Sequence, residues 1–572
     1  MKFFCVFCVF WGLVFPCVAL DREAFTFTKY DLHVRVEPEQ QRLGVRGRIT
    51  LRNDSTAPQK DIALQVSSTL SWKSIQIAGK AVQFVTHEYN SDIDHTGTLS
   101  EAIVTLPHDV PPQGTVELDI GYEGVIPLNV TRLTRIGVPE DKAKHTDWDQ
   151  IGKSFTAVRG IGYVAWYPVA TEAASLSDGN NVEEAIGRWK VRHTDTEMEV
   201  LFETTVDTPI FFTGTAGLAS VNTQPGISKI ASFTMVRPGI SVPTFVIADY
   251  QKLTPKDLLT IQYLPGQDEG AKAYAEIAAN VDPIILVGHG SKSLQILGLP
   301  DPEAASFVSE GMLLSPLKLP VTNEALLDIV YARARRLVLS PRVWIQEGLA
   351  HYVQAAFIDE EAGRKAALDY LNAHRTLLVE AEQQHKSHTA EPPGTRLETA
   401  YSLINAPDGL YLQAKALYVW WMLRDLLGGT PVEALFNYHA DEDKDGAYMQ
   451  RVIEKQTHRD LQWFFDDWVY RDHGLPDFRV DSVYPRPVVG GGYIVTVTIE
   501  NLGDAGAEVP VVLRMQDGEL TKRIEVHAKS KASVRIEAFT TPLEVVVNDG
   551  SVPETDLSNN SYKIEMPEKQ SK

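Results

Sequence analysis

Cysteine is almost absent from this chain. Its three cysteines (Cys5, Cys8 and Cys17) all lie within the first 17 of its 572 residues. The rest of the chain therefore cannot form a disulfide bond or a thiolate zinc site. We expect its stability to come from hydrophobic cores, which a chain of this length can form in several domains.

Positive charge is also scarce relative to negative charge. The chain has 54 Lys and Arg residues against 75 Asp and Glu residues, a formal net charge of −21. Nucleic acids and anionic membrane surfaces carry the same sign and would repel the chain, so we predict neither as a partner. The hydrophobic content of 44% is that of an ordinary globular protein.

The N-terminal segment is typical of a secretory signal peptide. Lys2 precedes an unbroken apolar run over residues 3–15, and small residues occupy positions 17 and 19. We therefore predict a signal peptide over residues 1–19 and an exported protein, secreted or periplasmic. The run is short for a membrane span, and an uncleaved signal anchor is the alternative.

A two-residue hydrophobic period indicates a β domain over residues 20–252. Residues 30–36 and 43–51 alternate in this way, and short strand patterns continue through 116–120 to 244–248. Such alternation is typical of strands with one buried face, so we predict an N-terminal β-sandwich.

Helical patterns dominate the next region, which we predict as a mainly helical domain over residues 253–480. The expected helices cover residues 269–281, 322–339, 343–357, 362–382 and 412–427. The last of these is apolar on nearly all sides, which is typical of a buried central helix.

A proline- and glycine-rich stretch at residues 485–492 precedes a second β pattern. We predict an Ig-like β-sandwich over residues 481–566 and a polar tail over residues 567–572. The predicted fold class is multidomain α+β.

Four segments carry a family resemblance. Residues 344–350 (Trp-Ile-Gln-Glu-Gly-Leu-Ala), 464–470 (Phe-Phe-Asp-Asp-Trp-Val-Tyr), 474–478 (Gly-Leu-Pro-Asp-Phe) and 242–250 are similar to segments of the membrane alanyl aminopeptidase family. These enzymes are gluzincin zinc metallopeptidases. The resemblance implies a thermolysin-like peptidase domain, aminopeptidase activity and zinc, with Glu347 in the place of the third zinc ligand.

The chain departs from that family at its reacting groups. Where the family has His-Glu-x-x-His, this sequence has Tyr331, Ala332 and Arg335. Gln413 stands in the place of the catalytic tyrosine, with Tyr411 nearby. The segment that would hold the substrate amine and line the cleft reads Glu310, Gly311, Met312, Leu313 and Leu314, without the family's glutamate.

These substitutions remove what a zinc peptidase needs. A catalytic zinc takes three protein ligands, and a guanidinium cannot be one because it stays protonated. The general base is missing as well. We hypothesise that Arg335 forms an ion pair with Glu347 and replaces the metal bridge between two helices. The alternative is that Arg333, Arg335 and Arg336 form a solvated helix face.

Two weaker metal patterns remain. Glu347 and His351 are spaced to share one helix face, and either a metal or a half-buried polar pair could explain them. Asp441, Asp443 and Asp445 match the first half of a calcium loop whose closing glutamate is missing. A turn capped by Asp445 is the alternative.

We therefore predict an exported metallopeptidase-like protein that is catalytically inactive and zinc-free. It would bind peptides or protein partners through the former active-site cleft. The alternatives are an active zinc-dependent aminopeptidase with atypical ligands and a structural or adhesion protein.

Overall fold

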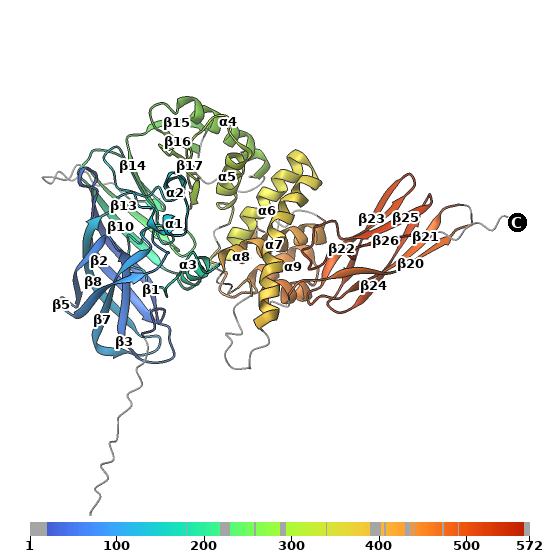
Figure 1. Ribbon diagram of the computed structural model, residues 1–572, viewed down its shortest axis with the longest axis horizontal. Coiled ribbons are helices and arrows are strands. Elements are labelled where there is room, and N and C mark those ends of the chain that lie inside the picture. Colours follow the sequence, from blue (N-terminus) through green and yellow to red (C-terminus); the bar gives the residue numbers. More distant parts are fainter. Residues whose placement is uncertain are drawn as a thin grey trace, which may run out of the picture.

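The structure is a computed structural model. It describes residues 20–565 except 180, 218–228, 257–258, 286–292, 339, 389–401, 405, 407, 429–434, 436, 441, 472–473 and 490. The predicted signal peptide and the tail therefore lie outside the described residues. Figure 1 shows a β unit at the N-terminal end, helices in the middle and an elongated β unit at the C-terminal end. None of the described helices is long and apolar enough to cross a membrane.

The N-terminal unit contains an eight-stranded sheet in the order β12-β13-β10-β1-β2-β8-β4-β5. The strands are β1 (Phe25–Glu37), β2 (Arg42–Asn53), β4 (Leu70–Ile77), β5 (Lys80–Ala81), β8 (Thr115–Val125), β10 (Glu197–Thr204), β12 (Thr215–Ala216) and β13 (Lys229–Val236). A second sheet has the order β3-β7-β6, with β3 (Gln59–Ser67), β6 (Gln83–Asn90) and β7 (Thr98–Val110).

These two sheets share one hydrophobic core, to which β1, β2, β3, β7 and β8 all contribute. On β1 the buried residues alternate with exposed ones, as the sequence period predicts. A third sheet of β9 (Phe155–Val158), β11 (Ile210–Phe212) and β14 (Phe245–Ala248) completes the strands of this unit. Helices α1 (Thr131–Arg135), α2 (Glu140–Thr146) and α3 (Asn181–Arg192) connect them.

The middle region is less helical than predicted, because it begins with a five-stranded mixed sheet. Its order is β15-β16-β17-β19-β18, with β15 (Gln251–Lys256), β16 (Leu259–Tyr263), β17 (Leu294–Gly298), β18 (Phe307–Ser309) and β19 (Met312–Ser315). Strands β17 and β19 are short, mostly apolar runs, so their period does not distinguish them from buried helix, and the alternation of β16 covers only five residues. Helix α4 (Asp268–Ile285) packs on this sheet.

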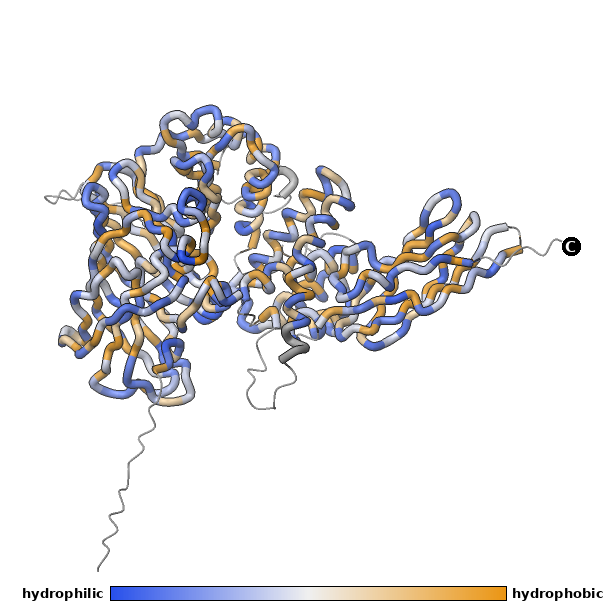
Figure 2. Tube along the Cα trace, viewed as in Figure 1, coloured by the Kyte–Doolittle hydropathy of each residue, from blue (hydrophilic) through white to orange (hydrophobic). Residues whose placement is uncertain are grey.

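The four other predicted helices are present, with ends that differ by a few residues, and two helices without a predicted counterpart follow them. They are α5 (Asn323–Ala334), α6 (Val343–Ala362), α7 (Arg364–His388), α8 (Gly409–Leu427), α9 (Tyr448–Thr457) and α10 (Gln462–Phe465), which continues as a π-helical turn (Asp466–Tyr470). Helix α8 is the buried central helix that its composition predicts, and α6 and α7 pack against it. Figure 2 shows hydrophobic residues concentrated along these helices and the strands.

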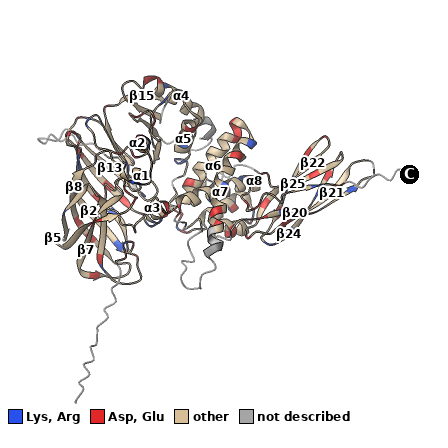
Figure 3. Ribbon diagram, viewed as in Figure 1, with Lys and Arg blue, Asp and Glu red and all other residues tan. Residues whose placement is uncertain are grey.

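Two sheets form the C-terminal unit. One contains β20 (Phe478–Pro487), β21 (Tyr493–Asn501) and β24 (Lys531–Ala538). The other contains β22 (Ala507–Met515), β23 (Gly518–Val526), β25 (Pro542–Val547) and β26 (Ser561–Lys563). Their core is continuous with that of the helices. Charged residues are distributed over all three regions (Figure 3). The whole is a multidomain mixture of sheets and helices.

Candidate functional site

Helices α5 and α6 pack against each other and place Tyr331, Arg335 and Glu347 together. Helix α5 begins after Thr322, whose hydroxyl accepts the amide hydrogen of Ala325, as a helix N-cap does. Tyr331 lies in the last turn of α5 and Arg335 caps its C-terminus. Glu347 lies near the start of α6, so the reversal of the chain between the helices brings its carboxylate to the other two side chains.

Both oxygens of the Glu347 carboxylate are occupied. The Nη2 atom of Arg335 lies 3.1 Å from Oε1, and the hydroxyl of Tyr331 donates a hydrogen bond to Oε2. Arg335 is 6% exposed, Glu347 is also 6% exposed and Arg333 is 1% exposed. The hypothesised ion pair between Arg335 and Glu347 is therefore present, and a solvated face is wrong for Arg333 and Arg335.

Burial and neighbouring charges shift the pKa values of Glu347 and Arg335 in opposite directions. Burial disfavours ionisation of Glu347, but Arg335, Lys190 and the Tyr331 hydroxyl outweigh it and hold the pKa of Glu347 below its ordinary value. Burial also disfavours charge on Arg335, yet Glu347 raises the pKa of that guanidinium. Burial raises the pKa of the Tyr331 hydroxyl above its ordinary value. At neutral pH the cluster is therefore a charged pair with one neutral donor.

The N-terminal unit reaches the same cluster. Arg335 Nη2 also donates to the carbonyl of Ile240 at 3.0 Å, in the connection between β13 and β14. Two residues further on, the carbonyl of Val242 accepts a hydrogen bond of 2.8 Å from the Ser309 hydroxyl. Lys190, which acts on the pKa of Glu347, is in the last turn of α3. One guanidinium thus links α5, α6 and the N-terminal unit.

His351 follows Glu347 by one turn of α6 but is part of a different hydrogen-bond group. Its Nδ1 lies 2.9 Å from Gln354 Oε1, which also accepts the Tyr370 hydroxyl at 2.9 Å. Its ring centre is 5.0 Å from that of Tyr331. Burial lowers the pKa of His351, so its ring is neutral at physiological pH. His351 and Glu347 thus belong to separate hydrogen-bond groups, which differs from the polar pair of the alternative.

Zinc does not fit this arrangement of residues. The Glu347 carboxylate is held by two hydrogen donors, and the guanidinium beside it would repel a cation. Within the described parts of the chain, no three His, Cys, Asp or Glu side chains are grouped to hold a metal. Glu347 as a remnant zinc ligand stays a prediction.

The remaining predicted site residues are in different surroundings. Ala332 is buried on α5, and Tyr411 and Gln413 lie near the start of α8. The Tyr411 hydroxyl accepts a 2.9 Å hydrogen bond from the buried amine of Lys415. Near the proposed amine-binding position, Gly311 lies against the guanidinium of Arg336.

The predicted cleft lining needs a correction. Met312, Leu313 and Leu314 form β19 and are buried, because that strand is covered on both faces. Their side chains therefore do not line an accessible cleft. Glu310, at the turn before β19, acts on the pKa of Arg335 and so lies near the cluster.

The acidic loop of the calcium prediction makes contacts with arginines. Asp443 accepts from Arg342 Nε at 2.8 Å and from the Tyr438 hydroxyl at 2.8 Å. Asp445 pairs with Arg451 at 2.8 Å and accepts the amide hydrogen of Ala447. Asp441 lies outside the described residues. Calcium at Asp441, Asp443 and Asp445 stays a prediction.

Three partners of the cluster were missed by the sequence interpretation. Tyr331 was treated only as a replaced histidine, and its bond to Glu347 follows from the helix packing. Lys190 and the carbonyl of Ile240 lie far away along the chain. No local sequence pattern marks them, because only the docking of the N-terminal unit brings them near Arg335.

Comparison with known proteins does not assign a family. No protein-family model matches the chain, and no match was found among curated proteins. The resemblance to the aminopeptidase family stays a prediction.

Proposed function

We propose that this chain is an exported, metallopeptidase-like protein that neither holds zinc nor hydrolyses peptides, and that binds a peptide or protein partner. The observation that carries the proposal is the engagement of both Glu347 oxygens by Arg335 and Tyr331 in a buried site. A positive charge fixed beside the carboxylate does electrostatically what a metal would do between the two helices. The aminopeptidase resemblance supports the thermolysin-like assignment within this proposal, and the strand pattern beyond residue 492 supports the Ig-like one.

The proposed binding region is the surface around that cluster. Lys190 of α3, the connection containing Ile240, and the helices α5 and α6 meet there. Lys190 supplies positive charge at this surface, and Glu310 supplies a negative charge near the buried Arg335. Peptides carry hydrogen-bonding backbone groups and charged ends, which such a mixed surface can recognise.

A zinc and activity measurement tests the inactive half of the proposal. The purified full chain is analysed for bound zinc and incubated with alanyl and leucyl fluorogenic substrates, with and without added zinc. We expect no stoichiometric zinc and no turnover above buffer. Stoichiometric zinc together with hydrolysis would establish the active aminopeptidase alternative instead.

A binding measurement tests the other half. A pool of fluorescein-labelled random pentapeptides is titrated with the protein and followed by anisotropy. We expect saturable binding that Lys190→Glu weakens, because the substitution reverses a charge at the proposed surface. Lys229→Glu, on β13, is the matched control and should leave binding unchanged. Absence of binding would favour the structural or adhesion alternative.

A further inference from the structure

A second feature lies on the outward face of the eight-stranded sheet. A hollow of about 290 Å³ opens there across β10, β1, β2, β8 and β4. It is on the opposite side of the sheet from the N-terminal core, since the core-facing residues of β1 alternate with those that face the hollow. It is separate from the Arg335–Glu347 cluster.

Gly44 leaves the floor of the hollow open, whereas a Cβ atom on Gly121 would lie 2.8 Å from Ser74 Oγ. Gly44 on β2 is paired with Arg35 of β1 on one side and with Glu123 of β8 on the other. Gly121 stands two residues from Glu123 on the same strand face. Glycine inside a strand often marks the close approach of a ligand or another backbone. A Cβ atom built on Gly44 would meet nothing within 4 Å, so the space above that strand is open.

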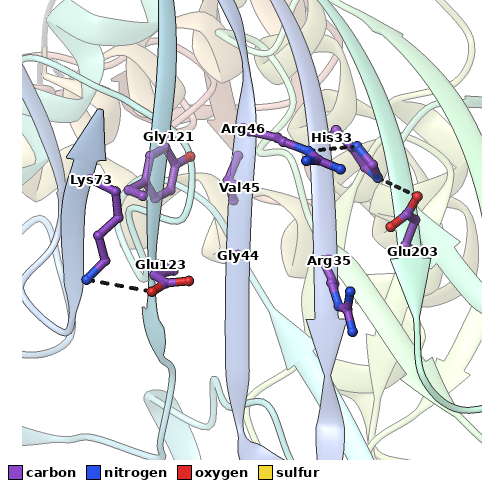
Figure 4. A pocket seen from close by; sticks show the side chains of 10 residues that line it. His33, Arg35, Gly44, Val45, Arg46, Lys73, Gly121, Glu123 and Glu203 are labelled. Atoms are coloured by element: carbon purple, nitrogen blue, oxygen red, sulfur yellow. Dashed lines mark hydrogen bonds and ion pairs between the residues drawn. The ribbon is translucent and has the colours of Figure 1, made fainter. Parts of the chain in front are cut away.

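The charges around the hollow leave one cation without an acidic partner. Glu203 Oε1 lies 2.7 Å from His33 Nε2, and Glu123 Oε1 lies 3.6 Å from Lys73 Nζ. Arg46 instead donates from Nε to His33 Nδ1 at 3.3 Å (Figure 4). Arg46 has no carboxylate partner among the described residues.

The lining includes three cationic side chains in a chain whose net charge is −21. Arg35 is paired with Glu37 at 2.8 Å, and Lys73 lies near Glu123, whose other oxygen accepts a hydrogen bond from Arg42. Arg46 is therefore the lining cation that an anionic ligand can reach. The terminal nitrogens of a guanidinium are matched to carboxylate and phosphate oxygens. The two carboxylates are acceptors for hydroxyl groups.

We propose that this hollow binds a small polyhydroxylated anion, the size of a sugar acid or a sugar phosphate. The guanidinium of Arg46 pairs with its anionic group, and Glu123 and Glu203 accept hydrogen bonds from its hydroxyls. The ring of Tyr122 is directed away, because its hydroxyl donates to the carbonyl of Trp166 inside the unit. The floor is therefore strand backbone, and a polar ligand fits it better than an aromatic one.

Titration calorimetry on the full chain tests the proposal with three probes: D-glucuronate, glucose 6-phosphate and glucose. We expect at least one of the two anions to bind at a single site, and glucose to bind about tenfold more weakly or not at all. The difference in affinity between D-glucuronate and glucose 6-phosphate shows whether the site prefers a carboxylate or a phosphate. Added salt weakens the binding, because part of it is electrostatic.

Two variants act on the site in different ways. Arg46→Gln removes the charge, and Gly44→Val fills the hollow with a residue that strands favour. Each is expected to weaken anion binding about tenfold or more while the thermal unfolding midpoint stays close to that of the wild type. Because a new side chain at Gly44 has open space, this second variant remains informative if the first one folds poorly.

Arg48→Gln is the matched control. Arg48 is on the same strand and face as Arg46, pairs with Asp119 at 2.9 Å and does not line the hollow. Anion binding should be unchanged in this variant. The proposal is overturned if neither anion binds at tens of millimolar, if glucose binds equally well, or if Arg48→Gln weakens binding as much as Arg46→Gln does.

Discussion

Arg335 cannot be removed alone without leaving the buried Glu347 carboxylate uncompensated. Breaking a buried ion pair in this way costs about 3–5 kcal/mol. We therefore predict that Arg335→Met lowers the thermal unfolding midpoint. Tryptophan fluorescence, recorded during heating, measures this midpoint. The double variant Arg335→Met, Glu347→Leu should recover most of that loss, because neither charge of the pair then remains buried.

The exposed pair of Arg48 and Asp119 is the matched comparison for this prediction. Their side chains are 54% and 35% exposed, and surface pairs contribute at most about 1 kcal/mol. Arg48→Gln should hardly change the midpoint. If the double variant were as unstable as Arg335→Met, the Arg335–Glu347 pair would not be the cause of the loss.

Glu554 gives a second prediction at this scale. It is 0% exposed, and burial raises its pKa to about 7 although Phe478 N, Asn548 and Asn560 donate hydrogen bonds to it. The folded protein therefore keeps a proton on Glu554 that the unfolded chain, with a pKa near 4.5, already releases at a lower pH. Stability from this group is complete below about pH 4.5 and is lost as the pH rises through about 7.

Thermal unfolding at a series of pH values between these limits checks this sign. As the pH rises, the unfolding midpoint of the wild type should fall relative to that of Glu554→Gln, because glutamine does not titrate. Asp556→Asn is the control, since that carboxylate is exposed and caps the turn at Ser558. A constant difference between wild type and Glu554→Gln would contradict a raised pKa.

At the scale of the element, α6 and α8 approach most closely at Gly348. A Cβ atom there would lie 2.5 Å from the Cβ of Ala416 and 3.0 Å from Trp420 Cδ1. Gly348→Ala should therefore destabilise the protein by about 1–3 kcal/mol, although alanine is the better helix former. The second substitution Ala416→Gly should reduce this loss by making room.

Gly409→Ala is the control for the helix propensity itself. Gly409 is the first residue of α8, and a Cβ there would meet only Glu183 Oε2 at 3.6 Å, an ordinary contact. We expect a midpoint equal to or slightly above that of the wild type in thermal denaturation. An equal loss in Gly348→Ala and Gly409→Ala would mean that the close helix contact is not responsible.

Elements with a strong period could be predicted from the sequence, and so could one contact. The alternation on β1 and β2 and the apolar surface of α8 are local signals that packing reinforces. The Arg335–Glu347 pair was hypothesised because the family resemblance puts these opposite charges at two positions that would hold one metal. The mixed sheet of β15 to β19 could not be recognised, because β17 and β19 are short apolar runs without a clear period and β15 is polar with a proline.

At the scale of the molecule, the helices and the C-terminal unit share one core. Buried residues of α6 and α8 belong to the same hydrophobic cluster as those of β21, β22 and β25. Polar contacts cross the same boundary: Trp468 Nε1 donates to the carbonyl of Gly506 at 2.8 Å, and Arg523 bridges Asp425 of α8 and Glu508 of β22. The two regions should therefore unfold together.

Truncation after residue 477 tests this coupling, because it removes β20 to β26 and exposes their share of the core. Each Å² of apolar surface that becomes exposed costs roughly 25 cal/mol of stability. The cost of exposing the boundary between the two regions therefore exceeds the small free energy of unfolding of a domain. We expect the truncated chain to lose the calorimetric transition of the helices together with that of the removed sheets. Val489→Ser, at a fully exposed position of the same unit, should leave both transitions in place. A truncated chain whose helices melt at the temperature of the intact protein would show that the shared core does not couple them.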